Sequence, residues 1–175
     1  MSGRSIAHKS VPINRENRPS DSEIVVQIDY CFFGRQPVLV ASCTRTNMTM
    51  AKLVRNRSPT EESVKNLSQF LLLLGHPCIC LQSDGEAGLK LLMDKVQAAI
   101  CRDNPGGAQR IRVRTVLGYC SNANGHVERA VRSLKGLIRT YVCDVEIRLS
   151  SPDCNFVVKE ESSLSSYIIL YSSWV

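Results

Sequence analysis

Three carboxylates have the residue types and the settings to do chemistry. Asp29 ends the apolar run Val25-Val-Gln-Ile-Asp29, Asp84 follows Leu81-Gln-Ser, and Glu128 lies in Asn124-Gly-His-Val-Glu128-Arg. Carboxylates that a fold brings within about 4 Å repel one another by roughly 4 kcal/mol per pair at an effective dielectric of about 20. Such a cluster requires cations, and oxygen-only ligands suit Mg²⁺ or Mn²⁺. Two ions roughly 4 Å apart can support an in-line phosphoryl displacement.

The segment from Ser121 through Tyr141 predicts the helix that carries Glu128. Apolar residues recur at i, i+4, i+7 and i+11, and a charged stripe repeats these offsets one residue later. Ser121 or Asn122 could cap the helix. The stripe could instead be a solvated face with an ordinary Glu128–Arg132 pair worth a few tenths of a kcal/mol. The seam consists of Val127, Val131, Leu134 and Ile138, and the stripe of Glu128, Arg132, Lys135 and Arg139.

Alternating apolar residues predict a strand over 24–32, with Gln27 and Asp29 on its other face. A turn at 34–37 and a second strand at 38–42 complete a hairpin, and 47–54 predicts a third strand. The run 78–82 has strand length and delivers Asp84 at its carboxyl end, although Asp84 could also be a helix N-cap.

Two further helices are expected before the Glu128 helix. Ser58 and Glu61 form a possible capping box, with Pro59 in the first helical position and Gly75 at the end. The second helix follows Asp84. The expected buried seams are Val64, Leu67, Leu71 and Leu74 in the first helix, and Leu89, Leu92, Met93, Val96 and Ile100 in the second.

The order Asp29, Asp84, Glu128 and the element Asn124-Gly-x-x-Glu-Arg129 resemble the catalytic core of retroviral and retrotransposon integrases over roughly residues 24–142. The third motif is most similar to integrase segments of retrotransposon Pol polyproteins. The resemblance implies an α/β, ribonuclease-H-like fold with a mixed central sheet flanked by helices. It also implies a two-metal polynucleotidyl transferase that processes DNA ends and transfers them to target DNA.

The same resemblance assigns roles to particular residues. Asp29 would bridge two Mg²⁺ or Mn²⁺ ions, Asp84 would hold one and Glu128 the other. Arg132 and Lys135 match the basic positions that face the element's DNA end. Glu86 is an additional carboxylate at a position where the family commonly has another residue. Further nucleic-acid contacts are expected from Asn124, His126, Arg129 and Arg139.

Charge and composition divide the chain into three parts. The net charge is +6, yet residues 144–175 hold five acidic and two basic residues, so the basic excess lies in residues 1–143. A basic body suits a polyanionic partner, although a generally basic protein is an open alternative. We expect a disordered basic arm over 1–22, a core-like domain over 23–143 and a divergent acidic Ser-rich tail over 144–175 that packs poorly.

The eight cysteines include no Cys-x-x-Cys pair, and neither a disulfide framework nor a zinc site is expected. Residues 1–20 lack a secretory signal, and no apolar run has membrane-spanning length. We therefore expect an intracellular protein without membrane association, nuclear if active in a eukaryotic host. Expected partners are DNA, both element ends and target, and further copies of the chain.

Two alternatives to the integrase hypothesis remain at this stage. One is a catalytically silent nucleic-acid-binding remnant on the same fold. The other is a metal-dependent ribonuclease-H-like nuclease, which would need a fourth acidic residue, with Glu86 as the obvious candidate.

Overall fold

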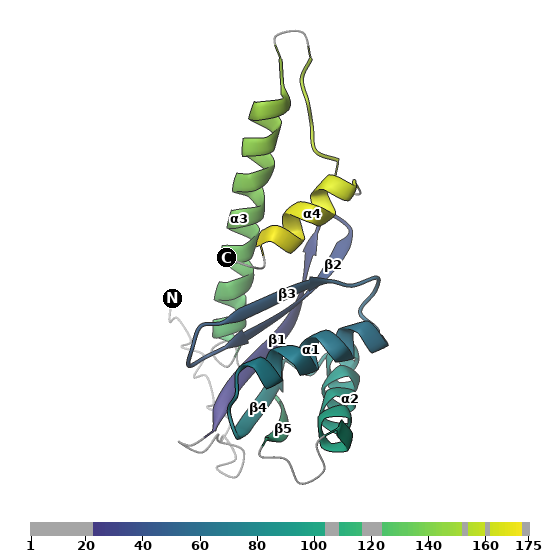
Figure 1. Ribbon diagram of the computed structural model, residues 1–175, viewed down its shortest axis with the longest axis vertical. Helices are drawn as coiled ribbons and strands as arrows, with labels where there is room; N and C mark the ends of the chain where they lie inside the picture. The colour runs from purple at the N-terminus through teal and green to yellow at the C-terminus, as the bar shows by residue number, and fades with distance from the viewer. Residues whose placement is uncertain (1–22, 104–108, 117–123, 152–153, 160–161, 173–175) are drawn as a thin grey trace, which may run out of the picture.

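The computed structural model describes residues 23–103, 109–116, 124–151, 154–159 and 162–172 (Figure 1). The basic arm expected over 1–22 and the helix caps expected at Ser121 or Asn122 lie outside the described residues.

Five strands form one mixed sheet in the order β3-β2-β1-β4-β5. The β1–β2 and β2–β3 pairs are antiparallel, whereas β4 is parallel to both β1 and β5. The hairpin and the third strand therefore form as the sequence predicts, and the crossover through α1 returns the chain beside β1. The strands are β1 (Ile24–Phe33), β2 (Gln36–Cys43), β3 (Thr49–Leu53), β4 (Cys78–Ser83) and β5 (Arg110–Thr115).

Helices cover both faces of this sheet. One buried cluster joins the sheet to α1 and α2, and a second joins the opposite face to α3 and α4. In Figure 1, α3 runs along the sheet and continues past its end, with α4 beside it. The ribonuclease-H-like arrangement of a mixed sheet between helices is confirmed. The helices are α1 (Glu61–Leu73), α2 (Ala87–Asp103), α3 (Gly125–Leu149) and α4 (Ser163–Ser172).

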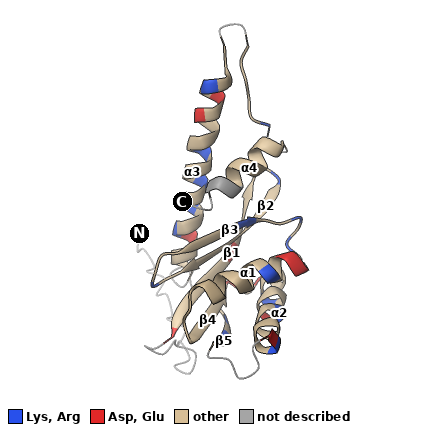
Figure 2. Cartoon of the chain, viewed as in Figure 1, with Lys and Arg blue, Asp and Glu red and all other residues tan. Residues whose placement is uncertain are grey.

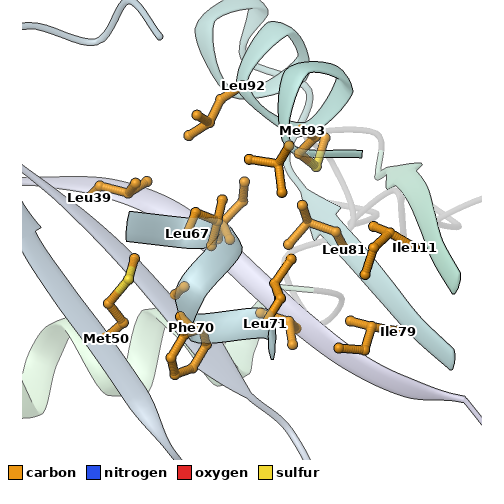
Figure 3. Packing of buried hydrophobic residues seen from close by; sticks show 14 of the residues in the cluster. Leu39, Met50, Leu67, Phe70, Leu71, Ile79, Leu81, Leu92, Met93 and Ile111 are labelled. Carbon is orange, nitrogen blue, oxygen red and sulfur yellow. The ribbon is translucent and has the colours of Figure 1, made fainter. Parts of the chain in front are cut away.

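Successive side chains of β1 point to opposite faces of the sheet, so its two faces contact different clusters. Ile24, Val26 and Ile28 are buried in the cluster shared with α1 and α2, whereas Cys31 belongs to the cluster under α3. Asp29 is an odd-numbered residue like Cys31, so it lies on the α3 face, as expected. Figure 3 shows the α1–α2 side of the sheet, where Leu67 and Leu71 of α1 lie among side chains of the strands and of α2.

The predicted start of α1 is wrong by two residues. The N-cap is Thr60, whose hydroxyl accepts the Ser63 N–H at 3.1 Å, while the Ser63 hydroxyl accepts the Thr60 N–H at 2.9 Å. This reciprocal pair is a capping box built on different residues from the expected Ser58 and Glu61. Gly75 follows the helix with φ of +62°, a conformation that favours glycine.

Helix α2 follows its predicted seam closely, because all five expected apolar residues are buried. It begins beside a tight contact: a Cβ placed on Gly88 would lie 2.4 Å from the backbone oxygen of Arg57. Gly85, just before the helix, has φ of +94°, and its missing Cβ makes room for Thr115. These two glycines let the segment after β4 pass between its neighbours.

The expected boundary at residue 143 falls inside α3, which continues to Leu149 without interruption. The segment beyond it runs back beside α3, where the Glu146 carboxylate accepts the Val158 N–H at 2.9 Å. In α4, Ile168 and Ile169 are 4% and 0% exposed and belong to the cluster under α3. The expectation that residues 144–175 pack poorly is therefore wrong for α4.

The seven cysteines within the described residues are all free thiols. Burial raises the pKa of the Cys31 thiol to about 11, so that this thiol stays protonated near neutral pH. Among the described helices, none combines the length and the apolar character needed to cross a membrane.

Candidate active site

Asp29 lies inside β1, two residues past the segment paired with β4, and Asp84 lies one residue beyond the end of the neighbouring parallel strand β4. Gln27 of β1 pairs in register with Gln82 of β4, and each carboxylate comes two residues after its glutamine. Because side chains alternate across a strand, Asp29 shares the face of Gln27, which is the face covered by α3. Asp29 is half-buried, whereas Asp84 is exposed just beyond the strand end.

Glu128 is an exposed residue in the first turn of α3, and β1 holds that turn directly. The Gln27 side-chain oxygen accepts the backbone N–H groups of His126 at 3.1 Å and of Val127 at 3.0 Å. The first N–H groups of a helix have no partner within the helix. The N-cap residue Asn124 makes no side-chain capping bond, so Gln27 satisfies these groups from the neighbouring strand.

Strand β4 holds the same helix end through Gln82. The Gln82 amide nitrogen donates to the side-chain oxygen of Asn124 at 2.9 Å, and its oxygen accepts from the Arg114 guanidinium. Gln82 is fully buried and Asn124 is 9% exposed. Asn124 was expected to contact nucleic acid, yet its described contact anchors the helix. Neither of the two glutamines that bond to the start of α3 was singled out from the sequence.

The electrostatics of Asp29 show that the acidic residues act on one another. Burial, together with the negative charges of Asp84, Glu86 and Glu128, raises the pKa of the Asp29 carboxyl from 3.8 to about 6. The Tyr30 N–H, which donates to Asp29 Oδ1 at 2.7 Å, opposes the rise. The fold thus gathers negative charge from β1, β4 and α3 around one half-buried carboxyl.

The donor set suits an oxygen-coordinated divalent cation, because carboxylates are the ligands that Mg²⁺ and Mn²⁺ prefer and added positive charge would relieve the repulsion. The side chains do not form a closed cluster, however. No group of three His, Cys, Asp or Glu residues within the described parts of the chain is arranged to hold a metal ion. Convergence of Asp29, Asp84 and Glu128 to metal-sharing distance stays a prediction.

Glu86 has a partner that the sequence did not reveal. Its carboxylate pairs with the Arg57 guanidinium at 3.0 Å, and Arg57 also lies over the Phe32 ring, 4.9 Å from the centroid. The pair is partly exposed, so its contribution to stability is small. It places one cation directly against Glu86.

Charged residues recur along α3 (Figure 2). The members of the predicted stripe differ in exposure. Arg132 and Arg139 are exposed, as is Arg129, whereas Lys135 is half-buried. The positive charge of Lys135 opposes the pKa rise of the Cys31 thiol. The ordinary ion pair between Glu128 and Arg132 is not formed in the described structure. His126 is half-buried, and its backbone is held by Gln27.

Solved structures of retroviral proteins share this architecture. A chain of the simian T-cell lymphotropic virus intasome, in complex with PP2A regulatory subunit B56 gamma, aligns with 86% of this chain at a TM-score of 0.59 and 19% identity. The catalytic core domain of BIV integrase aligns with 85% of this chain, and with 81% of its own, at a TM-score of 0.50 and 20% identity. The fold is that of a retroviral integrase catalytic core.

The integrase-core fold is also seen in the HTLV-2 integrase catalytic core domain in complex with magnesium, in a trimeric form. This domain aligns over 86% of the present chain and 82% of its own, with a TM-score of 0.51 and 15% identity. The present chain covers 46% of the intasome chain, less than half of that protein's length. Neither the protein-family models nor the curated proteins gave a match to the sequence.

Proposed function

We propose that the chain is the integrase core of a retrotransposon, a polynucleotidyl transferase that processes DNA ends and joins them to target DNA. The observation that carries this proposal is the setting of Asp29. On an integrase-core fold, this half-buried carboxyl feels the charges of Asp84 from the adjacent strand and of Glu128 from α3. Three acidic residues from three different parts of the chain would, once brought to metal-sharing distance, form the arrangement that metal-dependent phosphoryl transfer requires.

Asp29, Asp84 and Glu128 would hold two Mg²⁺ or Mn²⁺ ions, which when bound supply a polarised phosphate and stabilise the leaving oxygen. Such ions keep several of their waters and bind through few carboxylates, so a closed all-protein cage is not needed for this role. Magnesium appears in the HTLV-2 core domain to which this chain is similar.

The basic residues of α3 would bind the DNA end. Arg132 and Arg139 are exposed on the helix that carries Glu128, so phosphates approaching this carboxylate pass along them. Lys135 and Arg129 add charge on neighbouring positions. Such contacts are with the backbone and carry no base information, so binding would be largely independent of sequence. Assembly with further copies and a nuclear location in a eukaryotic host belong to the same proposal.

A strand-transfer assay with Mg²⁺ tests this function on the full chain. Asp84→Asn should lower the rate by more than the roughly 100-fold that loss of a residue orienting a metal ligand costs. Glu86→Gln is the matched control, because Glu86 is two residues away and already paired with Arg57. It should keep the rate within a few-fold of wild type. Activity that survives Asp84→Asn would overturn the proposal.

A second candidate function is a silent nucleic-acid-binding protein on the same fold. The exposed cations of α3, Arg129, Arg132 and Arg139, favour it, because phosphate contacts of this kind need no metal. Wild type that binds duplex DNA tightly yet transfers no strand in Mg²⁺ or Mn²⁺ would establish this alternative. The nuclease alternative is weaker, because its candidate fourth carboxylate, Glu86, is engaged by Arg57.

A further inference from the structure

The sequence Gln-x-Asp occurs twice, on the two strands that meet at the candidate site. Gln27 precedes Asp29 on β1 and Gln82 precedes Asp84 on β4, and the two glutamines are register partners. They are 6% and 0% exposed. Burying an uncharged amide in an otherwise apolar strand costs free energy unless its polar atoms are hydrogen-bonded. Both side chains therefore need hydrogen-bond partners, and both have partners at the start of α3.

Gln27 uses its side-chain oxygen for two bonds at once. A carbonyl oxygen has two lone pairs, and the N–H groups of His126 and Val127 bond to it at 3.1 and 3.0 Å. Both donors are backbone groups, so these bonds fix the main chain of the helix. The residue immediately after them is Glu128. The position of its Cα is therefore set by the strand that carries Asp29.

Gln82 adds a third anchor, and Arg114 sets its orientation. A guanidinium only donates, so the Gln82 oxygen must face Arg114. The amide nitrogen then faces the other way, where it donates to the Asn124 oxygen at 2.9 Å. Hydrogen bonds thus connect Arg114 of β5, through Gln82 of β4, to Asn124, the residue that immediately precedes α3.

We propose that Gln27 and Gln82 are positioning residues that hold Glu128 against Asp29 and Asp84, an inference that rests on the proposed function. Each strand thus supplies one carboxylate and one anchor for the helix that supplies the third carboxylate. Anchors at Asn124, His126 and Val127 restrict both the axial position and the rotation of the first turn. Groups that orient metal ligands typically change metal affinity or activity by about 10- to 100-fold when removed.

Buried glutamines could instead satisfy backbone groups without any role in the site, and a matched control separates the two. Gln109 lies before β5, at the opposite end of that strand from Thr115. Its amide donates to the backbone oxygens of Leu71 at 2.9 Å and His76 at 3.1 Å. Gln109→Met therefore removes the same group and two bonds to backbone, away from the carboxylates.

The first measurement is backbone hydrogen exchange in the full chain, which needs no activity. Gln27→Met should speed exchange of the Val127 amide by about tenfold or more, the scale of one lost buried hydrogen bond. Gln27→Glu, which keeps an acceptor oxygen, should restore protection, and Gln109→Met should leave this amide unchanged. Equal exchange in wild type and Gln27→Met would overturn the anchor.

The second measurement is binding of Mn²⁺ alone, without DNA. Gln27→Met should weaken it by about 10- to 100-fold, and Gln109→Met should bind like wild type. Gln82→Met, which keeps both Gln27 bonds, serves as an independent variant if Gln27→Met does not fold, and should also weaken binding. Unchanged Mn²⁺ affinity in Gln27→Met and Gln82→Met would overturn the positioning role. If the wild-type chain binds Mn²⁺ tightly but does not catalyse strand transfer, only the proposed function is overturned. A wild type that does not bind Mn²⁺ would overturn both.

Discussion

Replacing Asp29 by asparagine should make the metal-free protein more stable at neutral pH. The pKa of Asp29 rises from 3.8 to about 6 on folding, chiefly through burial. At pH 7 the folded chain therefore carries a charge that its surroundings disfavour. A rise of this size corresponds to roughly 3 kcal/mol at full burial, and partial exposure reduces this to about 1–2 kcal/mol. The amide of the Asp29→Asn variant would keep an oxygen for the Tyr30 N–H.

The sign of the pH dependence follows from proton binding. Between about pH 4 and pH 6, the folded chain retains a proton on Asp29 that the unfolded chain has released, so wild-type stability falls as the pH rises through this window. Below pH 4 both states are protonated, and Asp29→Asn should gain nothing. Above pH 6 the full difference should appear.

Urea unfolding in EDTA at several pH values between 4 and 8 measures this difference. Asp94→Asn, which removes an exposed carboxylate of α2, provides the matched control and should show no such pH-dependent gain. An Asp29→Asn variant that is equally or less stable than wild type at pH 7.5 would refute the reasoning. So would a stability gain of the same size at pH 4, since it could not arise from ionisation.

Three further predictions concern α3, α4 and the loop packed on α2. Removing charge at Arg132 and Lys135 by Ala substitution should weaken binding to all DNA duplexes alike. The slope of log affinity against log salt concentration, measured by fluorescence anisotropy, should become shallower by about two units. An unchanged slope would contradict the DNA-binding role of α3. Ile169→Ala should lower the free energy of unfolding by about 2–5 kcal/mol, because Ile169 is fully buried, and an unchanged urea midpoint would mean that α4 is not part of the core. Gly88→Ala should lower the free energy of unfolding by roughly 1–3 kcal/mol, because its Cβ would meet the Arg57 backbone oxygen at 2.4 Å. Gly136 has open space around it, so Gly136→Ala should raise the free energy of unfolding by up to about 1 kcal/mol in the same urea titration.

The elements that follow a regular period were predictable from the sequence. The five-residue seam of α2 and the alternation of β1 reflect local geometry, which needs no knowledge of distant partners. The end of α1 was equally visible, because Gly75 takes a positive φ that few other residues tolerate. The same local reasoning placed Asp29 on the correct face of its strand.

Features decided by distant contacts were not predictable. Ser58 and Thr60 are each followed, three residues later, by a residue that could complete a capping box, and the helix uses Thr60. The close approach of the Arg57 backbone to Gly88 joins segments that are distant in the sequence. Asn124 follows the pattern of a surface turn, yet a glutamine 42 residues earlier in the sequence buries it. The packing of α4 depends on its contacts with α3 and β3, which the sequence of α4 alone does not reveal.

The double Gln-x-Asp pattern also makes the site sensitive to the alignment of β1. An anchor and a carboxylate two residues apart share one face, so a one-residue insertion ahead of Gln27 that shifted the strand would turn both toward α1 and α2 together. The helix would lose its attachment in the same event that removed Asp29 from the site. A one-residue insertion ahead of Gln27 should therefore abolish the site completely, with no intermediate in which Asp29 is kept without the α3 anchor.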